Sequence, residues 1–298
     1  MAVTGLPEML RAATTRGYAV GYLESWDLAS LEAVLDAAEA ERSPVIVGFG
    51  GMMTDAAWLE ARGIPMLGAA ARAAAERASV PVAAMFNEAA TVAQADLALV
   101  SGFNCVLLTT DDLPNDEAQR VTADLTRRAH ALGVAVEAEL GRLPDATVLG
   151  SCGEMTDPEE AARFVQTTGV DCLAVSVGNV HIKTDGWAQI DIGRLGELRA
   201  ATDVPFALHG GTSLPPHAVP HAVGHGVAKV NVGTVLKKVY WEALSQSVAS
   251  TGPAPFASVH DLLGSRNQAD YTAPARAALT EKARELMRLY GSAGQADR

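Results

Sequence analysis

Residues 205–234, PFALHGGTSLPPHAVPHAVGHGVAKVNVGT, combine two short apolar runs with a helical pattern between them. The first run indicates a strand at Pro205–His209, the second a strand at Ala228–Val232, and the segment between them a helix at Pro216–Val223. Apolar residues at consecutive positions, as in FAL and VNV, are typical of parallel strands whose two faces are both covered. The stretch therefore predicts a strand, a helix and a second strand parallel to the first.

The same alternation extends over the rest of the chain. Further strands are expected at Tyr18–Leu23, Pro44–Gly48, Pro81–Phe86, Cys105–Thr109, Val134–Leu140 and Cys172–Val177. Further helices are expected at Leu28–Ala40, Gly68–Ala78, Thr91–Val100, Glu117–Ala131, Pro158–Thr168, Ile192–Ala201 and Val235–Val248. Repeated strand and helix units of this kind predict a parallel sheet with helices packed on it.

The number of these units decides between two α/β architectures. About eight strand and helix units are the number that closes a barrel. An open, doubly wound sheet is the alternative, but it normally has a Gly-rich fingerprint after its first strand, and none is present there. The expected fold is therefore a (β/α)8 TIM barrel formed as one domain by residues 1–298, with a C-terminal helical extension at Ala273–Tyr290.

Composition and charge exclude several classes of protein. The chain has 298 residues, 49% of them hydrophobic, and a formal net charge of -12, which argues against disorder and against nucleic acid or anionic lipid as a partner. Cys105, Cys152 and Cys172 form no C-x-x-C pair, so they indicate neither a disulfide framework nor a cysteine zinc site. No run reaches the roughly 20 apolar residues of a membrane span, and the N-terminus lacks a signal-peptide pattern. We expect a cytoplasmic protein that acts on a small molecule.

Polar residues are concentrated where the expected strands end. They are Asn87 and Glu88 after the third strand, Glu137 and Glu139 on the fifth, His181 after the sixth and His209 at the end of the seventh. In a TIM barrel the carboxyl ends of the strands meet at one mouth, where the catalytic groups lie. A single histidine beside an apolar strand is more often structural, but two at equivalent strand ends with nearby carboxylates indicate a divalent transition metal.

Two Gly-rich segments follow the seventh and eighth strands. They are His209–Ser213 (HGGTS) and Lys229–Thr234 (KVNVGT). Glycines there let backbone N–H groups approach an anion, and these two loops are the usual phosphate site of the barrel. The candidate substrate- or phosphate-binding residues are Gly210, Gly211, Thr212, Asn231, Gly233 and Thr234.

At these residues the chain resembles the class II, metal-dependent ketose-bisphosphate aldolases, the family of fructose- and tagatose-bisphosphate aldolases. The resemblance covers nearly the whole chain and is closest at Gly17–Gly21, Val136–Gly141, Thr156–His181, His209–Ser213, Lys229–Thr234 and Arg288–Gly294. It implies a homodimer or homotetramer and a zinc ion that is held by three histidines, polarises the ketose carbonyl and stabilises an enediolate. Two of those ligands map onto His181 and His209.

The third ligand and the catalytic aspartate of the family belong to an H-x-D-H motif, and here that place reads Met85-Phe86-Asn87-Glu88. Glu88 stands in place of the metal histidine, and a carboxylate can replace an imidazole. The set Glu88, His181 and His209 would accept Zn²⁺ first, with Mn²⁺ or Fe²⁺ as alternatives. Asn87 stands in place of the aspartate, and an amide can hydrogen-bond a hydroxyl but cannot take its proton.

The base must therefore come from elsewhere in the mouth. Glu139 is the first candidate, and Glu137, Asp27 and Glu24 are the alternatives. The resemblance also implies a lysine that contacts phosphate; Asp185 takes its place here, and Lys183 is the residue that could compensate. A negative charge at that position disfavours a phosphorylated substrate.

These observations favour a metal-dependent, aldolase-like carbon–carbon lyase that acts through a metal-stabilised enediolate. Its substrate is expected to be a sugar or keto compound other than fructose 1,6-bisphosphate, with one phosphate or none, and Asn87 is expected to position a substrate hydroxyl. A metal-dependent epimerase, isomerase or other lyase on the same scaffold is the first alternative. A catalytically silent, aldolase-like binding protein is the second.

Overall fold

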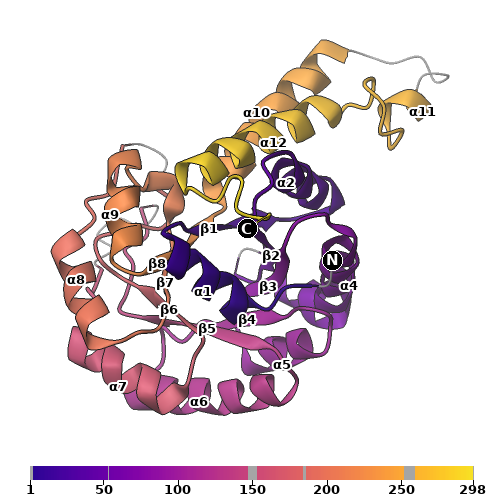
Figure 1. Cartoon of the computed structure of the whole chain (residues 1–298). Coiled ribbons are helices and arrows are strands. Elements are labelled where there is room, and N and C mark those ends of the chain that lie inside the picture. Colours follow the sequence, from indigo (N-terminus) through magenta and orange to yellow (C-terminus); the bar gives the residue numbers. More distant parts are fainter. Residues whose placement is uncertain (1–2, 53, 147–152, 184–185, 252–258, 298) are drawn as a thin grey trace.

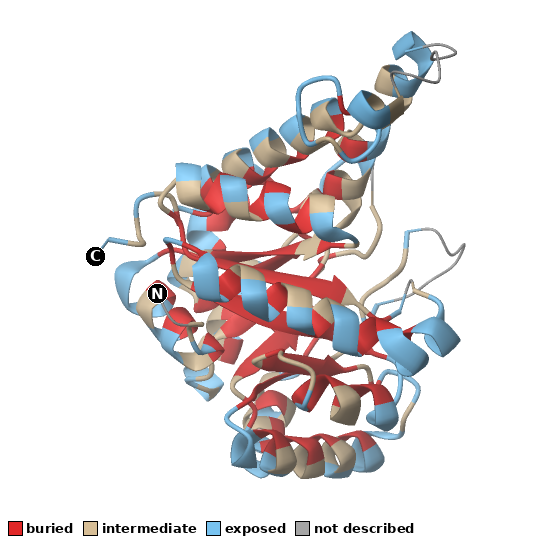
Figure 2. Ribbon diagram, turned by 90° about the vertical axis from the view of Figure 1, so that its right-hand side faces the viewer, coloured by how far each residue is buried: buried red, intermediate tan, exposed pale blue. Residues whose placement is uncertain are grey.

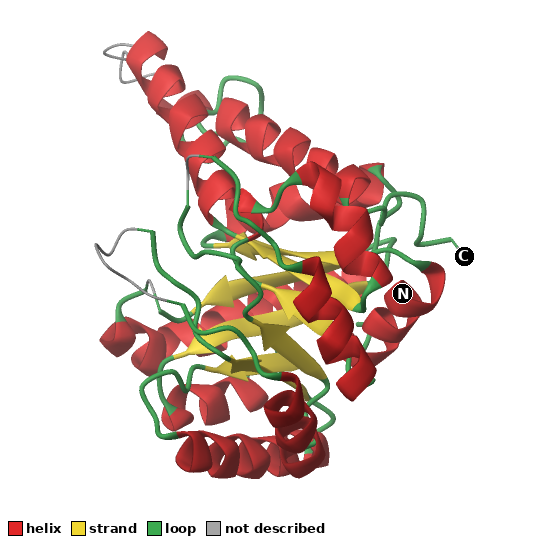
Figure 3. Cartoon of the chain, turned by 90° about the vertical axis from the view of Figure 1, so that its left-hand side faces the viewer, coloured by secondary structure: helices red, strands yellow, loops and turns green. Residues whose placement is uncertain are grey.

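Eight parallel strands form a closed barrel in the order β1-β2-β3-β4-β5-β6-β7-β8, as the sequence predicts (Figures 1 and 3). The structure is a computed structural model that describes residues 3–52, 54–146, 153–183, 186–251 and 259–297. The strands are β1 (Val20–Ser25), β2 (Val45–Gly50), β3 (Val82–Ala89), β4 (Cys105–Leu108), β5 (Ala135–Leu140), β6 (Cys172–Val175), β7 (Phe206–Leu208) and β8 (Val227–Val232). The expected TIM barrel is confirmed. That residues 1–298 form a single domain stays a prediction.

The helices lie around the barrel, at its ends and beyond it (Figure 1). They are α1 (Leu6–Arg16), α2 (Leu28–Ala40), α3 (Ala56–Trp58), the π-helix η1 (Leu59–Gly63), α4 (Ile64–Arg77), α5 (Val92–Leu99), α6 (Asn115–Ala131), α7 (Pro158–Thr168), α8 (Ile192–Ala201), the 3₁₀ turns η2 (Gly211–Ser213) and η3 (Pro216–Ala218), α9 (Val219–Gly224), α10 (Thr234–Thr251), α11 (Val259–Leu262) and α12 (Ala273–Leu289). Asp157 caps α7 by accepting hydrogen bonds from the backbone of Glu159 and Glu160, as the Asp-Pro pair predicts.

One helix that we did not predict closes one end of the barrel. Helix α1 lies across the barrel opening in Figure 1 and begins with Pro7 in its first turn. Its buried face comprises Leu6, Met9, Leu10 and Ala13, which pack with the apolar side chains in the barrel interior. Those four residues follow the i, i+3, i+4, i+7 spacing of an amphipathic helix, so the pattern was present in the sequence.

The barrel interior changes from apolar to polar along the strands. The apolar side chains enclosed by the strands include Val20, Ile46, Ala83, Cys105 and Ala135, all near the strand starts. Buried polar residues lie toward the other end, and they are Asn87, Glu137, His209, Lys229 and Asn231. Figure 2 shows the strands as a continuous buried layer beneath partly exposed helices. The polar groups are thus held at the mouth by a rigid apolar base.

Strands β1 and β3 carry candidate residues further into the mouth than the sequence predicts. Strand β1 continues through Ser25 because Glu24 and Ser25 still pair with Gly48 and Phe49 of β2. Strand β3 continues to Ala89, so Asn87 lies within the strand and not in the loop after it. Both extensions place candidate residues on rigid backbone.

The C-terminal helices form an arm that projects from the barrel, with α11 near its tip (Figures 1 and 2). Helix α12, the predicted extension, packs against α2 and α10. The expected homodimer or homotetramer stays a prediction. Within the described residues, no helix has the length and apolar character that crossing a membrane requires.

Gly48 provides a test of the close approach of β2 to β3. A Cβ placed on Gly48 would collide with the carbonyl oxygen of Met85 and lie 2.8 Å from the Tyr22 ring. We expect Gly48→Ala to lower the free energy of unfolding by about 1–3 kcal/mol in urea titrations, because the strand backbone must shift.

Gly224→Ala is the matched control, since a Cβ there meets no heavy atom within 4 Å. We expect this control to unfold at the same urea concentration as the wild type or a higher one. Equal stability of the Gly48→Ala variant and the wild type would contradict the packing described here.

Candidate active site

His209 is fixed at the end of β7 by a buried ion pair that crosses the barrel interior. Its Nε2 lies 2.9 Å from Oε1 of Glu137, which comes from β5. Lys229 of β8 donates to the same oxygen at 3.1 Å and lies 2.9 Å from the second carboxylate oxygen. The side chains of Glu137 and Lys229 have no solvent exposure. Three strands therefore hold one imidazole ring in place.

The ionisation of this group follows from its contacts. Burial opposes a charge on Glu137, but Lys229 and His209 outweigh it and lower the pKa of Glu137 to about 2. Burial likewise opposes a charge on His209, but its hydrogen bond to Glu137 and the nearby carboxylates raise the pKa of His209 to about 10. Because a carboxylate can only accept, Nε2 of His209 carries the proton in this hydrogen bond.

The other ring nitrogen of His209 faces the mouth. Nδ1 is buried and, among the described residues, has no hydrogen-bond partner. Oxygens of Glu139 and Glu88 lie 3.3 and 3.5 Å from it. His181 stands beside it with a ring-to-ring distance of 6.0 Å.

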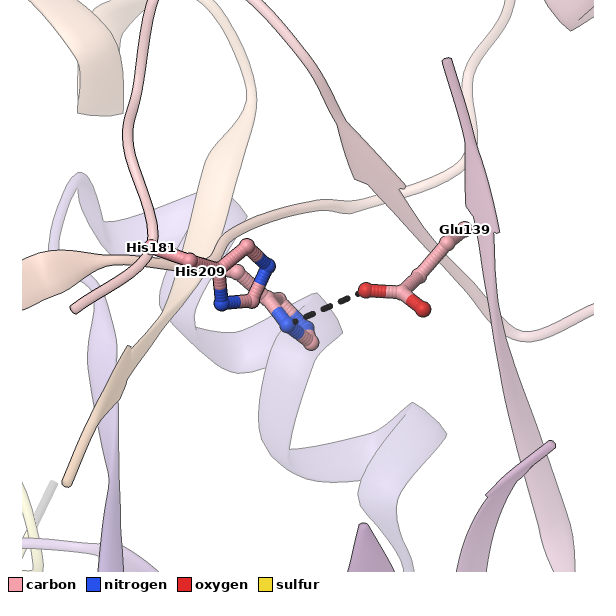
Figure 4. Close-up of side chains that lie close together, drawn as sticks. All are labelled: Glu139, His181 and His209. Carbon is pink, nitrogen blue, oxygen red and sulfur yellow. Dashed lines mark ion pairs between the residues drawn. The ribbon is translucent and has the colours of Figure 1, made fainter. Parts of the chain in front are cut away.

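Three of these side chains are close enough to bind one ion. Ligand atoms of Glu139, His181 and His209 all lie within 4.8 Å of one another, and Figure 4 shows His209 and Glu139 pointing toward each other. A metal-binding histidine typically donates its second N–H to a carboxylate, and Glu137 supplies that acceptor. The residues present therefore fit a divalent metal at Nδ1 of His209.

Glu88 approaches the same nitrogen because β3 is irregular at its end. The pairing of β3 with β4 shifts between Phe86 and Ala89, and Glu88 has a φ of 54°, which is unusual for a residue with a side chain. As a result two consecutive residues reach the mouth. Asn87 accepts a hydrogen bond of 3.4 Å from Asn231, while Glu88 faces His209.

His181 is positioned by hydrogen bonds between loops. Its backbone N–H donates to Pro144 at 2.9 Å, and its carbonyl accepts from Ala146 at 3.0 Å. Asn179, two residues earlier, donates to the carbonyl of His209 at 3.0 Å. The loops after β5, β6 and β7 are therefore tied together around the candidate metal site.

The two carboxylates that face Nδ1 differ in ionisation. Burial raises the pKa of Glu139 to about 8, and the neighbouring carboxylates add to the rise against the effect of His209. Burial also opposes ionisation of Glu88, but the nearby rings of His209 and, less strongly, His181 lower its pKa. Burial and the charge of His209 lower the pKa of His181, so its ring is more readily available as a neutral ligand.

The two Gly-rich loops lie against each other. Gly210 has a φ of 71° and packs on the backbone of Val180. The hydroxyl of Thr212 accepts a hydrogen bond of 3.2 Å from the N–H of Val235, in the first turn of α10. Burial raises the pKa of Glu24, which lies beside Gly233, and Lys237 opposes that rise at 2.8 Å.

The structure brings most of the predicted site residues together, but not all of them. Asp27 caps α2, where its carboxylate accepts from the backbone of Ser30 at 2.7 Å, so it is not part of the cluster around His209. Lys183 is half-buried after His181. Asp185 and Cys152 lie outside the described residues.

The sequence predicts no individual role for Lys229, and it predicts Glu137 only as an alternative base. The signal was the pair of charged residues inside otherwise apolar strands, VEAEL and VAKVNV, because a charge there needs a partner of opposite sign. The predicted metal ligands Glu88, His181 and His209 and the predicted base Glu139 stay predictions, and the structure offers Glu139 as a second candidate for the third ligand.

Lys229 provides a test of the buried ion pair. We expect Lys229→Met to lower the free energy of unfolding by about 3–5 kcal/mol, because the buried carboxylate of Glu137 loses the cation that contacts both of its oxygens. Adding Glu137→Gln to that variant should recover part of the loss. Urea unfolding followed by circular dichroism measures both.

Lys282→Met is the matched control, because the ion pair of Lys282 with Glu285 on α12 is partly exposed. We expect it to change stability by less than about 1 kcal/mol. A loss in Lys229→Met no larger than in this control would refute a structural role for the buried pair.

Comparisons with known proteins show the family to which the chain belongs. Residues 4–295 match the family described as Fructose-bisphosphate aldolase class-II. The chain is 31% identical to a "Probable fructose-bisphosphate aldolase" of Bacillus subtilis, over 99% of this chain and 100% of that protein. It is 30% identical to the "Uncharacterized protein YdjI" of Escherichia coli, over 96% of each chain.

Solved structures show the same fold over the whole length. The crystal structure of the YdjI aldolase from Escherichia coli K12 covers 99% of both chains with a TM-score of 0.78 and 28% identity. A putative fructose-1,6-bisphosphate aldolase from Coccidioides immitis covers 98% of both chains with a TM-score of 0.79 and 25% identity. The chain therefore belongs to the class II fructose-bisphosphate aldolase family and is an aldolase-type lyase.

Proposed function

We propose that the protein is a metal-dependent lyase that cleaves a carbon–carbon bond in a sugar or keto substrate other than fructose 1,6-bisphosphate. The observation that carries this proposal is the orientation of His209. Its Nδ1 faces His181 and two carboxylates, while its Nε2 is held by Glu137. Such an arrangement suits a metal ligand, and the family supplies the reaction class.

His181, His209 and either Glu139 or Glu88 would hold the ion. The set of two imidazoles and one carboxylate accepts Zn²⁺, Mn²⁺ or Fe²⁺. When bound, the metal supplies a Lewis acid that withdraws electrons from a substrate carbonyl. Without the metal, Nδ1 of His209 is protonated, and binding replaces that proton.

Of the two carboxylates beside Nδ1, Glu88 and Glu139, one would bind the metal and the other would accept a proton. The one that does not bind the metal can accept the proton of a substrate hydroxyl as the adjacent carbon–carbon bond breaks. Asn87 cannot take this proton, but its amide can hydrogen-bond a hydroxyl and orient it. Asn231 Nδ2 donates a hydrogen bond of 3.4 Å to Oδ1 of Asn87, so the orientation of the Asn87 amide group is fixed.

The substrate has room beside Glu139. A cavity of about 360 Å³ extends from this residue between the loops after β4 and β5. Asp111, Glu139 and Glu154 line it together with Arg142 and Arg163. Mixed charges with several hydrogen-bonding groups suit the hydroxyls of a sugar chain.

Metal analysis and matched carboxylate variants test the proposal together. We expect about one divalent ion per purified chain, and loss of it in His181→Ala and His209→Ala. Between Glu88→Gln and Glu139→Gln, one variant should lose the metal. The other should keep the metal and lose about 10²–10⁴-fold in kcat, because it lacks the proton acceptor. Elemental analysis and turnover of a ketose panel provide the two readouts.

Assays in deuterated water separate the proposed lyase from an epimerase or isomerase at the same site. Asn87 stands where the resemblance implies the aspartate that acts in cleavage, and the absence of that aspartate favours this second candidate. Deuterium incorporation into ketoses without a cleaved product would support the second candidate. Full activity of a metal-free wild type would refute both.

A further inference from the structure

The carboxylate of Glu24 occupies the space next to the Gly-rich turn between β8 and α10. Strand β1 pairs with β8 so that Leu23 lies opposite Val232, which places Glu24 beside Gly233. A Cβ on Gly233 would collide with Glu24 Oε2 and lie 3.2 Å from its carboxyl carbon. On the other side, a Cβ on Gly50 would lie 2.9 Å from Oε1. Two glycines thus leave room for this one carboxylate.

Glu24 is also held in place by charge. Lys237, in the first turns of α10, lies 2.8 Å from its Oε1 and 6.0 Å above the ring of Trp26. The side chain of Glu24 is only 18% exposed, whereas that of Lys237 is 42% exposed. The carboxylate is therefore the buried member of the pair.

The position of this carboxylate is one that would otherwise favour an external anion. Helix α10 begins at Thr234 and has 18 residues, so its N-terminus carries a partial positive charge. The loop Gly210–Ser213 joins it through the hydrogen bond between Thr212 and Val235. Lys237 pairs with Oε1 of Glu24, whereas Oε2 is the atom that lies beside Gly233, so a second anion at this turn would meet that oxygen at close range.

We propose that Glu24 is a specificity-determining residue that excludes phosphate from the subsite formed by Gly210–Thr212 and Gly233–Thr234. The substrate group bound there is an uncharged hydroxyl, which can donate to the Glu24 carboxylate. The substrate is thus a ketose or keto compound without phosphate at that end. This substrate class rests on the proposed lyase function, whereas the exclusion of phosphate does not.

Binding of inorganic phosphate tests the exclusion without any turnover. Calorimetry is carried out with the protein as purified, comparing wild type, Glu24→Gln and Glu8→Gln. We expect Glu24→Gln to bind phosphate about tenfold or more tightly than the wild type, because the variant loses the repelling charge.

Glu8→Gln is the matched control. Glu8 is exposed on α1, and its substitution changes the net charge by the same amount as Glu24→Gln. It should bind phosphate as weakly as the wild type. Glu24→Asn is a second uncharged variant, for which the same gain is expected. Wild-type binding as tight as that of the uncharged variants would overturn the proposal.

Turnover gives an independent readout on the wild type alone. A ketose should be cleaved with a kcat/KM about tenfold or more above that of its phosphorylated form. The reverse preference would overturn the inference but leave the lyase function intact. A gain of phosphate binding in Glu24→Gln without any metal-dependent turnover would support the exclusion and refute the proposed function.

Discussion

The site depends on the buried ion pair between Glu137 and Lys229. Removing two charges from water costs several kcal/mol for each ion, so such a pair is retained only where its geometry is closely satisfied. Here Glu137 meets Lys229 and His209 at 2.9 Å each, inside a barrel closed at the other end by α1. The imidazole therefore cannot rotate to present Nε2 to the mouth in place of Nδ1. The direction in which Nδ1 points depends on this constraint.

Around this fixed ring the chain departs from its family in a consistent way. The irregular end of β3 brings Glu88 to the position where the resemblance implies a histidine, and Asn87 replaces the aspartate. Two carboxylates, Glu88 and Glu139, then face one nitrogen. A second anionic feature, Glu24, lies beside the Gly-rich turn. The acidic mouth favours a metal and a polyhydroxylated substrate over a bisphosphate.

Much of the fold could be predicted from the sequence because parallel strands covered on both faces are apolar at consecutive positions. All eight strands were expected within a few residues of their observed bounds, as were the bounds of α2, α7 and α8. His181 and His209 could be found because they follow the sixth and seventh expected strands, whose carboxyl ends meet at the barrel mouth. That Glu139 forms a cluster with these two histidines could not be predicted, because it depends on distances between side chains of different strands and loops. The approach of Glu88 depends on a local irregularity that no residue pattern marks.

Anomalous scattering from crystals grown with Zn²⁺ or Mn²⁺ tests the central claim most directly, since it locates the ion and shows which nitrogen binds it. The account predicts an ion on Nδ1 of His209 and on His181, with Nε2 still hydrogen-bonded to Glu137. An ion bound to Nε2, or one bound away from His209, would contradict it.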